Sequence, residues 1–168
     1  MNQTRFLKIV DYLLTTKECK RIIQLLDKED LEIVDRGDLA TYSRNIWIDD
    51  EFADEIYSRV YSHLPTGTVR CNEYIRFSKY TSGQEFNLHT DGLNRDAYGN
   101  QSKYTVNIFL NHGFGGGETE FFQEGGAISA KPQAGRAVLF DREILHRGNR
   151  VLSGTKYLLR TDVMVPEE

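Results

Sequence analysis

The part of the chain that follows Gly67 has the pattern of a β-sheet protein. Helical spacing gives way there to short runs rich in Val, Ile, Tyr and Phe, separated by Gly and Asn. Short strands joined by glycine-containing turns predict an antiparallel sandwich or a jelly roll. The expected strands cover residues 69–80, 85–91, 104–111, 118–123, 127–130, 136–140, 144–147 and 156–165.

The residues before Gly67 predict two helices. Thr15, with Glu18 three positions later, has the form of a capping box at a helix start. An apolar stripe at helical spacing follows it, made of Cys19, Ile22, Ile23 and Leu26. A second helix is expected from Asp50, with apolar residues every fourth position until Pro65 ends it. Residues 4–14 are expected to form an opening strand, and residues 31–49 an irregular segment.

Length and composition indicate one globular domain. The chain has 168 residues, of which 39% are hydrophobic and 27% charged. We expect a single domain over residues 1–168, with a helical support at 15–65 and a jelly-roll core at 69–165. The net charge of −4 gives no global basic footprint for nucleic acid.

The cysteine content and the apolar pattern predict the cellular compartment of the chain. Two cysteines do not make a disulfide framework, and they fit a reducing compartment. The first residues lack the apolar core of a signal peptide, and no apolar run approaches the length of a membrane span. We therefore expect a cytoplasmic protein with no membrane and no nucleic-acid partner. Its oligomeric state cannot be read from the sequence.

One short stretch carries a possible metal site. On a strand, residues two apart point to the same face, so His89 and Asp91 would direct an imidazole and a carboxylate to one point. His146 is a second histidine in a predicted strand far downstream. Two histidines and one carboxylate are the ligand set of non-haem iron(II) oxygenases. Zinc accepts the same ligands, and an isolated His-x-Asp pair is more typical of a solvated surface strand.

Four blocks of sequence give this pair its context. They are Tyr-x-x-Gly-x-x-Phe-x-x-His-x-Asp at 80–91, Gly-Gly-Glu-Thr-x-Phe at 116–121, Pro-x-x-Gly-x-Ala-x-x-Phe at 132–140, and His-x-Gly at 146–148 followed by Gly-Thr-Lys-Tyr at 154–157. In order and spacing, these blocks resemble the motifs of the prolyl 4-hydroxylase-like branch of the 2-oxoglutarate/iron(II) dioxygenases. The resemblance covers roughly residues 70–165.

The resemblance implies a fold and a set of cofactors. The fold is mainly β, a double-stranded β-helix (jelly roll) with two N-terminal helices packed on one sheet. The implied catalytic centre is Fe(II) held by His89, Asp91 and His146, with 2-oxoglutarate as cosubstrate, dioxygen as oxidant and ascorbate as an optional cofactor. The ligating imidazoles must be neutral and the carboxylate ionised, because protonated groups cannot bind the metal.

The resemblance also assigns residues to the cosubstrate. It places Lys156 at the distal carboxylate of 2-oxoglutarate, and Tyr80 and Thr119 beside the same molecule. Lys156 lies among residues expected to be buried, where an ammonium without a partner is costly. Two alternatives remain: Lys156 can extend to solvent from an edge strand, and Tyr80 can be a packing residue.

Arg160 is a further candidate. Lys156, Leu158, Arg160 and Asp162 share one face of a strand. If Lys156 points into the barrel, Arg160 does so as well, nearer the metal. We expect Arg160 to contact the primary substrate or the cosubstrate as a bidentate donor. The alternative is a structural ion pair with Asp162 or another acid.

The implied reaction couples oxidative decarboxylation of 2-oxoglutarate to hydroxylation of a C–H bond. Asp91 favours hydroxylation over halogenation, because halogenating relatives lack this carboxylate. The substrate is expected to be a prolyl or other residue of a peptide or protein, or a small molecule such as a free amino acid. Loops 36–45 and 92–103, with Arg44 and Arg95, are the expected substrate contacts. The alternatives are a jelly-roll module that binds metal or ligand without turnover, and a cupin enzyme of other chemistry.

Overall fold

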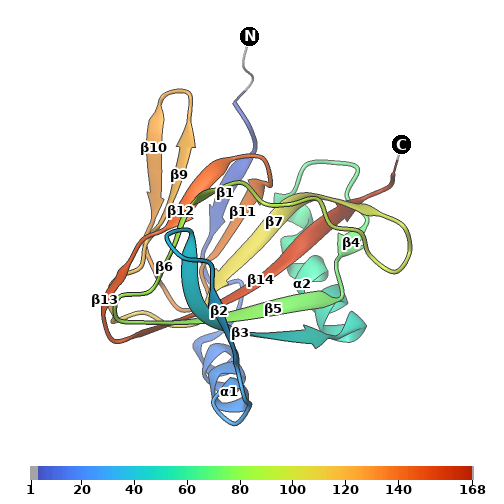
Figure 1. Cartoon of the computed structure of the whole chain (residues 1–168). Coiled ribbons are helices and arrows are strands. Elements are labelled where there is room, and N and C mark those ends of the chain that lie inside the picture. Colours follow the sequence, from blue (N-terminus) through green and yellow to red (C-terminus); the bar gives the residue numbers. More distant parts are fainter. Residues whose placement is uncertain (1–3, 168) are drawn as a thin grey trace.

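The computed structural model describes residues 4–167, so the expected domain 1–168 extends beyond the described residues at both ends. The helices are α1 (Thr16–Leu26), α2 (Asp50–Val60) and the 3-10 helix η1 (Tyr61–His63). The strands are β1 (Leu7–Val10), β2 (Glu32–Asp35), β3 (Ala40–Ile48), β4 (Arg70–Cys71), β5 (Tyr74–Thr81), β6 (Glu85–His89), β7 (Gln101–Phe109), β8 (Gly115–Gly116), β9 (Thr119–Gln123), β10 (Gly126–Ala130), β11 (Ala137–Asp141), β12 (Leu145–Gly148), β13 (Val151–Ser153) and β14 (Thr155–Val165). Figure 1 shows a mainly β molecule with two helices from the first part of the chain.

The sheet folds back on itself as a jelly roll. Its hydrogen-bonded path runs β1-β11-β7-β14-β5-β3-β6-β12-β9-β10, with β2 added beside β3 and β4 beside β14. All pairings along this path are antiparallel. Strands far apart in the sequence therefore meet, and the architecture is the expected double-stranded β-helix.

Strand β3 makes the corner between the two halves of the barrel. Residues 43–48 pair with β5, whereas Ala40 and Thr41 pair with β6. The expectation of an irregular segment at 31–49 was wrong, because this segment forms the β2–β3 hairpin. In β3 the positions from 44 to 48 are only partly buried or exposed. The strand consequently lacks the clean apolar alternation by which a strand is recognised.

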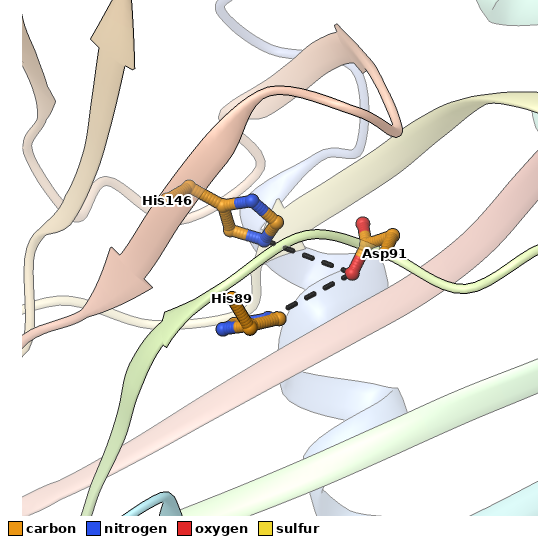
Figure 2. Close-up of side chains that lie close together, drawn as sticks. All are labelled: His89, Asp91 and His146. Carbon is orange, nitrogen blue, oxygen red and sulfur yellow. Dashed lines mark ion pairs between the residues drawn. The ribbon is translucent and has the colours of Figure 1, made fainter.

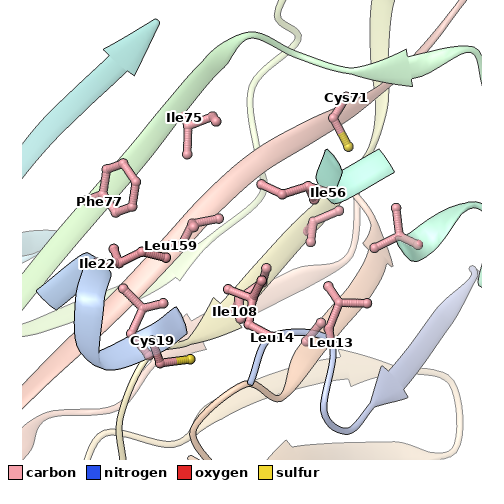
Figure 3. Packing of buried hydrophobic residues seen from close by; sticks show 14 of the residues in the cluster. Leu13, Leu14, Cys19, Ile22, Ile56, Cys71, Ile75, Phe77, Ile108 and Leu159 are labelled. Carbon is pink, nitrogen blue, oxygen red and sulfur yellow. The ribbon is translucent and has the colours of Figure 1, made fainter. Parts of the chain in front are cut away.

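The two helices cover one face of the barrel, as expected (Figure 1). Helix α1 begins with the predicted capping box between Thr15 and Glu18. Helix α2 ends at Val60, and η1 continues the chain to the turn before Pro65. Figure 3 shows side chains of both helices against the sheet. The packed residues include Cys19, Ile22, Ile56, Ile75, Phe77, Ile108 and Leu159.

The alternation of the central strands decides what lines the barrel interior. On β5, Ile75 and Phe77 face the helices, so Arg76 and Ser78 face the other way. On β14, Leu159 packs on the helices, whereas Lys156 and Arg160 line the internal pocket. The same sheet thus separates an apolar core from a polar pocket.

Two further features concern the described part of the chain. Within residues 4–167, no helix has the length and apolar character needed to cross a membrane. Both Cys19 and Cys71 are buried free thiols.

Candidate metal centre and cosubstrate pocket

Three side chains converge at one end of the pocket (Figure 2). His89 is the last residue of β6, and His146 on β12 is its direct cross-strand partner. Asp91 lies just beyond the end of β6, where its backbone N–H donates to the carbonyl of Arg142 at 2.8 Å. The Nε2 atoms of both histidines lie 3.7 Å from Asp91 Oδ1. One donor atom from each residue lies within 4.8 Å of the others, as a shared metal ion requires.

Backbone carbonyls orient both imidazoles. His89 Nδ1 lies 2.6 Å from the carbonyl oxygen of Asn87, and His146 Nδ1 lies 2.8 Å from that of Ile144. A carbonyl only accepts hydrogen bonds, so Nδ1 carries the proton and Nε2 is free to bind a metal. Burial and the neighbouring His146 lower the pKa of His89 to about 4, and burial also lowers the pKa of His146. Both rings are therefore neutral at neutral pH.

One oxygen of the Asp91 carboxylate accepts a hydrogen bond, and the other accepts none. Thr105 Oγ1 donates a hydrogen bond to Oδ2 at 2.7 Å. Oδ1 is buried and has no hydrogen-bond partner among residues 4–167. Burial alone would raise the pKa of Asp91, but the pKa is lowered overall, and the guanidinium of Arg160 and the hydroxyl of Thr105 are among the causes. An ionised, unpartnered oxygen between two neutral imidazole nitrogens fits a divalent metal ion.

Arg160 lies beside this carboxylate. Its Nη1 lies 3.0 Å from Asp91 Oδ1, which is within ion-pair distance. The contact does not have the geometry of a hydrogen bond. Its Nη2 donates to Asp162 Oδ1 at 3.4 Å. Arg160 therefore lies inside the barrel, beside the candidate metal ligands. It contacts both Asp91 and Asp162.

Lys156 is a buried cation at the other end of the same pocket. Its side chain is 1% exposed and makes no ion pair within the described part of the chain. Strand β14 lies between β5 and β7, so Lys156 does not reach solvent from an edge strand. Its Nζ lies 5.0 Å from the ring centre of Tyr80 and 5.6 Å from that of Phe109. Burial lowers the pKa of Lys156 to about 8.

The Gly-rich turn before β9 gives Lys156 its space. Gly117 has φ +73°, and a Cβ there would lie 2.7 Å from the Phe114 ring and 3.3 Å from Lys156 Cδ. The backbone conformation thus favours glycine, and a side chain there would clash with the Phe114 ring and crowd Lys156. Residues of this turn also form the short strand β8, which pairs with β13.

Tyr80 and Thr119, the residues expected beside the cosubstrate, are both pocket-lining residues. Lys156 lines the same pocket. Tyr80 is buried and stacks on Tyr42, with ring centres 5.2 Å apart, so packing and pocket lining are combined in one residue. Phe121, two residues after Thr119, is buried in the core, as the strand alternation predicts.

Several pocket residues were missed from the sequence. Arg76 and Asn107 line the pocket, and Thr105 holds Asp91. They lie in strands that pair only in the folded barrel, so local spacing gave no signal for them. Of the two arginines expected at the substrate, Arg44 lines the pocket, whereas Arg95 pairs with Glu167 at 2.5 Å.

The fold and the site together define a known class of enzyme. Residues 75–161 match the sequence model of the 2OG-Fe(II) oxygenase superfamily. The chain belongs to this superfamily, whose members require Fe(II), 2-oxoglutarate and dioxygen, and the cluster of His89, Asp91 and His146 can bind the iron. No curated protein matches the chain.

Solved structures share the fold with diverse activities. The 2OG complex of the viral collagen prolyl hydroxylase from Paramecium bursaria Chlorella virus-1 is 23% identical, with a TM-score of 0.73 over 96% of this chain and 97% of that one. A Pseudomonas putida prolyl-4-hydroxylase is 18% identical, with a TM-score of 0.74 over 98% and 94%. The α-ketoglutarate-dependent epimerase SnoN of nogalamycin biosynthesis is 11% identical, with a TM-score of 0.71 over 95% and 76%. At these identities the likeness shows the fold alone.

Proposed function

We propose that this chain is an Fe(II)- and 2-oxoglutarate-dependent hydroxylase that converts a C–H bond of a second substrate to an alcohol. The balanced reaction consumes 2-oxoglutarate, dioxygen and the C–H substrate, and yields succinate, carbon dioxide and the alcohol. The observation that carries the proposal is the buried Oδ1 of Asp91, which accepts no hydrogen bond from the described residues and lies 3.7 Å from the Nε2 atoms of His89 and His146. Both histidines line one pocket with Lys156, whose cation has no ion-pair partner in the described part of the chain.

The residues of the pocket have distinct roles in this proposal. His89, Asp91 and His146 hold the iron, which when bound supplies the redox chemistry that couples decarboxylation to C–H oxidation. Lys156 neutralises the distal carboxylate of 2-oxoglutarate in a site from which water is excluded. Tyr80 and Thr119 form the walls that orient the cosubstrate. Arg160 is near enough to the metal ligands to contact substrate or cosubstrate.

Two substrate classes fit this reaction. Two of the structural relatives described above are prolyl hydroxylases by name, which supports a prolyl or other residue of a peptide or protein. The other class is a small molecule such as a free amino acid, supported by the cationic side chains recessed in the pocket. A module that binds metal without turnover, or a cupin of other chemistry, would not need a buried lysine placed for a dicarboxylate.

The test is anaerobic and spectroscopic. Iron(II) and 2-oxoglutarate are added to the purified chain, and the weak visible metal-to-ligand charge-transfer band is recorded; oxygen is then admitted and succinate is measured. We expect a band and succinate formation, both lost in His89→Ala and both kept in His63→Ala, a histidine outside the pocket. Folded protein that binds iron(II) but gives neither signal would refute the proposal and favour the binding-module or cupin alternatives.

A further inference from the structure

Two arginines that line the pocket are direct neighbours on adjacent strands. Arg160 on β14 is the direct cross-strand partner of Arg76 on β5, and Asn107 on β7 is the partner of Arg160 on the other side. All three side chains line the same pocket. Like charges directly opposite each other on neighbouring strands destabilise a sheet. This arrangement therefore needs an anion to compensate it.

The protein itself supplies little of that compensation. Asp162 is the acid that both arginines approach, and each guanidinium lies 3.4 Å from it. Its Oδ2 also accepts a hydrogen bond from Asn94 at 2.8 Å, so one carboxylate is shared by three donors. The other acid near Arg160 is Asp91, which the proposed function assigns to the metal. When Asp91 is bound to the metal, Asp162 is the one carboxylate left to both arginines, and one positive charge of the pair is not neutralised.

Arg76, Arg160 and Asn107 form a row across three neighbouring strands, which is called the arginine row below. Two buried polar atoms of this row have no hydrogen-bond partner. Arg160 Nε and Asn107 Oδ1 are both buried without a hydrogen-bond partner among the described side chains and backbone. Buried polar groups are rarely left unpaired, and each such group costs free energy until a partner arrives. A donor and an acceptor therefore remain available next to the paired guanidinium groups.

This row is separate from the lysine end of the pocket. Lys156 and Arg160 are four residues apart on one strand, so their backbone positions are about 13 Å apart. The proposed function uses Lys156 for the distal carboxylate of 2-oxoglutarate. The arginine row can then serve a second anionic group, which enters from the substrate side.

We propose that Arg76 and Arg160 bind the carboxylate of the primary substrate, and that this substrate is a small carboxylic acid such as a free amino acid. In an interior residue of a peptide, the polar groups within a few bonds of the reacting carbon are neutral amides. In a free amino acid, a carboxylate stands there instead, and guanidinium groups match it with paired hydrogen bonds. This inference rests on the proposed hydroxylase function, and it narrows the substrate class.

Binding rather than turnover provides the test. The chain is loaded with Zn(II) and saturated with 2-oxoglutarate, so that no reaction occurs. The proteinogenic L-amino acids and their carboxamides are then titrated by calorimetry. We expect at least one amino acid to bind, and its carboxamide to bind about tenfold or more weakly, the effect of losing a charge-assisted hydrogen bond.

Substitutions on β5 test whether Arg76 is responsible for the preference for the acid over its carboxamide. Arg76→Gln should lower the affinity for the acid to that for the amide, whereas Arg76→Lys, which keeps the charge, should retain a preference for the acid. Lys79→Gln is the matched control, because Lys79 lies on the same strand but pairs with Asp27 outside the pocket. It should leave the preference unchanged.

Three results would overturn the inference: equal binding of acid and amide, an unchanged preference in Arg76→Gln, or no binding of any free amino acid. N-acetylated, C-amidated aspartate and glutamate are included as probes. If these bind and the free amino acids do not, the arginines recognise a peptide side chain, and the small-molecule assignment is wrong. If 2-oxoglutarate itself fails to bind, the proposed function fails, and the comparison of acid with amide can still be made without it.

Discussion

His89 and His146 face each other directly across two neighbouring antiparallel strands, with their ring centres 4.3 Å apart. The two residues are far apart in the sequence, and only the closure of the barrel makes them neighbours. Each ring is fixed by a carbonyl two residues before it, so both Nε2 atoms point toward Asp91 (Figure 2). The metal-binding geometry is therefore built into the strand pairing before any metal arrives.

Removal of the metal should lower the thermal stability of the chain. A ligand at about 100 times its Kd stabilises the folded state by about 2.7 kcal/mol. For a chain of this length, that corresponds to a rise in Tm of roughly 5–10 °C. We expect Fe(II), added without oxygen, to raise the Tm and a chelator to reverse the change. In His146→Ala neither addition should move the Tm; an equal rise in this variant would place the metal elsewhere.

Thr105 should control metal affinity without touching the metal. Its hydroxyl holds Asp91 Oδ2 at 2.7 Å, and both residues are buried. Loss of a hydrogen bond that orients a metal ligand typically weakens metal binding by about 10–100-fold. Thr105→Val should show this loss in an Fe(II) or Co(II) titration, while Thr105→Ser, which keeps the hydroxyl, should bind nearly as tightly as the unmodified chain. Equal affinities for the two variants would argue against this role.

The affinity for 2-oxoglutarate should fall as the pH rises above about 8. Burial lowers the pKa of Lys156 from 10.5 to about 8, and only its protonated form attracts a carboxylate. If the charged form alone binds, the Kd rises toward tenfold per pH unit above that pKa. Calorimetric titrations at pH 7 and pH 9 measure the change. Lys156→Met should bind weakly at both pH values; a pH-independent Kd in the unmodified chain would contradict the assignment.

The same pKa shift predicts how stability depends on pH. Between about pH 8 and 10.5 the unfolded chain binds more protons at Lys156 than the folded chain does. The free energy of unfolding of the ligand-free protein therefore receives a contribution from this group that increases with pH in that window. Denaturant unfolding at several pH values should show a smaller rise in Lys156→Met than in the unmodified chain.

The cap of α1 should contribute measurably to stability. Thr15 Oγ1 accepts from the Glu18 backbone N–H at 3.2 Å, and the Glu18 carboxylate accepts from the Thr15 backbone N–H at 2.7 Å. Replacing such a cap residue with alanine costs about 1 kcal/mol. Thr15→Ala should therefore unfold at a lower denaturant concentration. Thr16→Ala, an exposed neighbour inside the helix, should change the unfolding free energy much less.

Elements that are stabilised by contacts between residues close in the sequence could be predicted from the sequence. The capping box and the apolar stripe located α1, because a helix is stabilised by residues three and four positions apart. The His-x-Asp pair and the ordered blocks that contain and follow it identified the three residues that the structure brings together as a candidate metal site. Even there the structure changed a detail: β6 ends at His89, and Asp91 is held beyond the strand by a backbone hydrogen bond to Arg142.

Tertiary structure alone decided what stands around those ligands. The β3 corner brings Tyr42 and Arg44 to the pocket, and the register of β5 and β14 sets Arg76 opposite Arg160. Local periodicity tells which face a residue takes within its own strand, but not which residue of another strand lies beside it. The sequence by itself thus determined the class of fold and the three residues of the candidate metal site. Which charged side chains meet in the pocket was decided by strand register, because register depends on contacts along whole strands that are far apart in the chain.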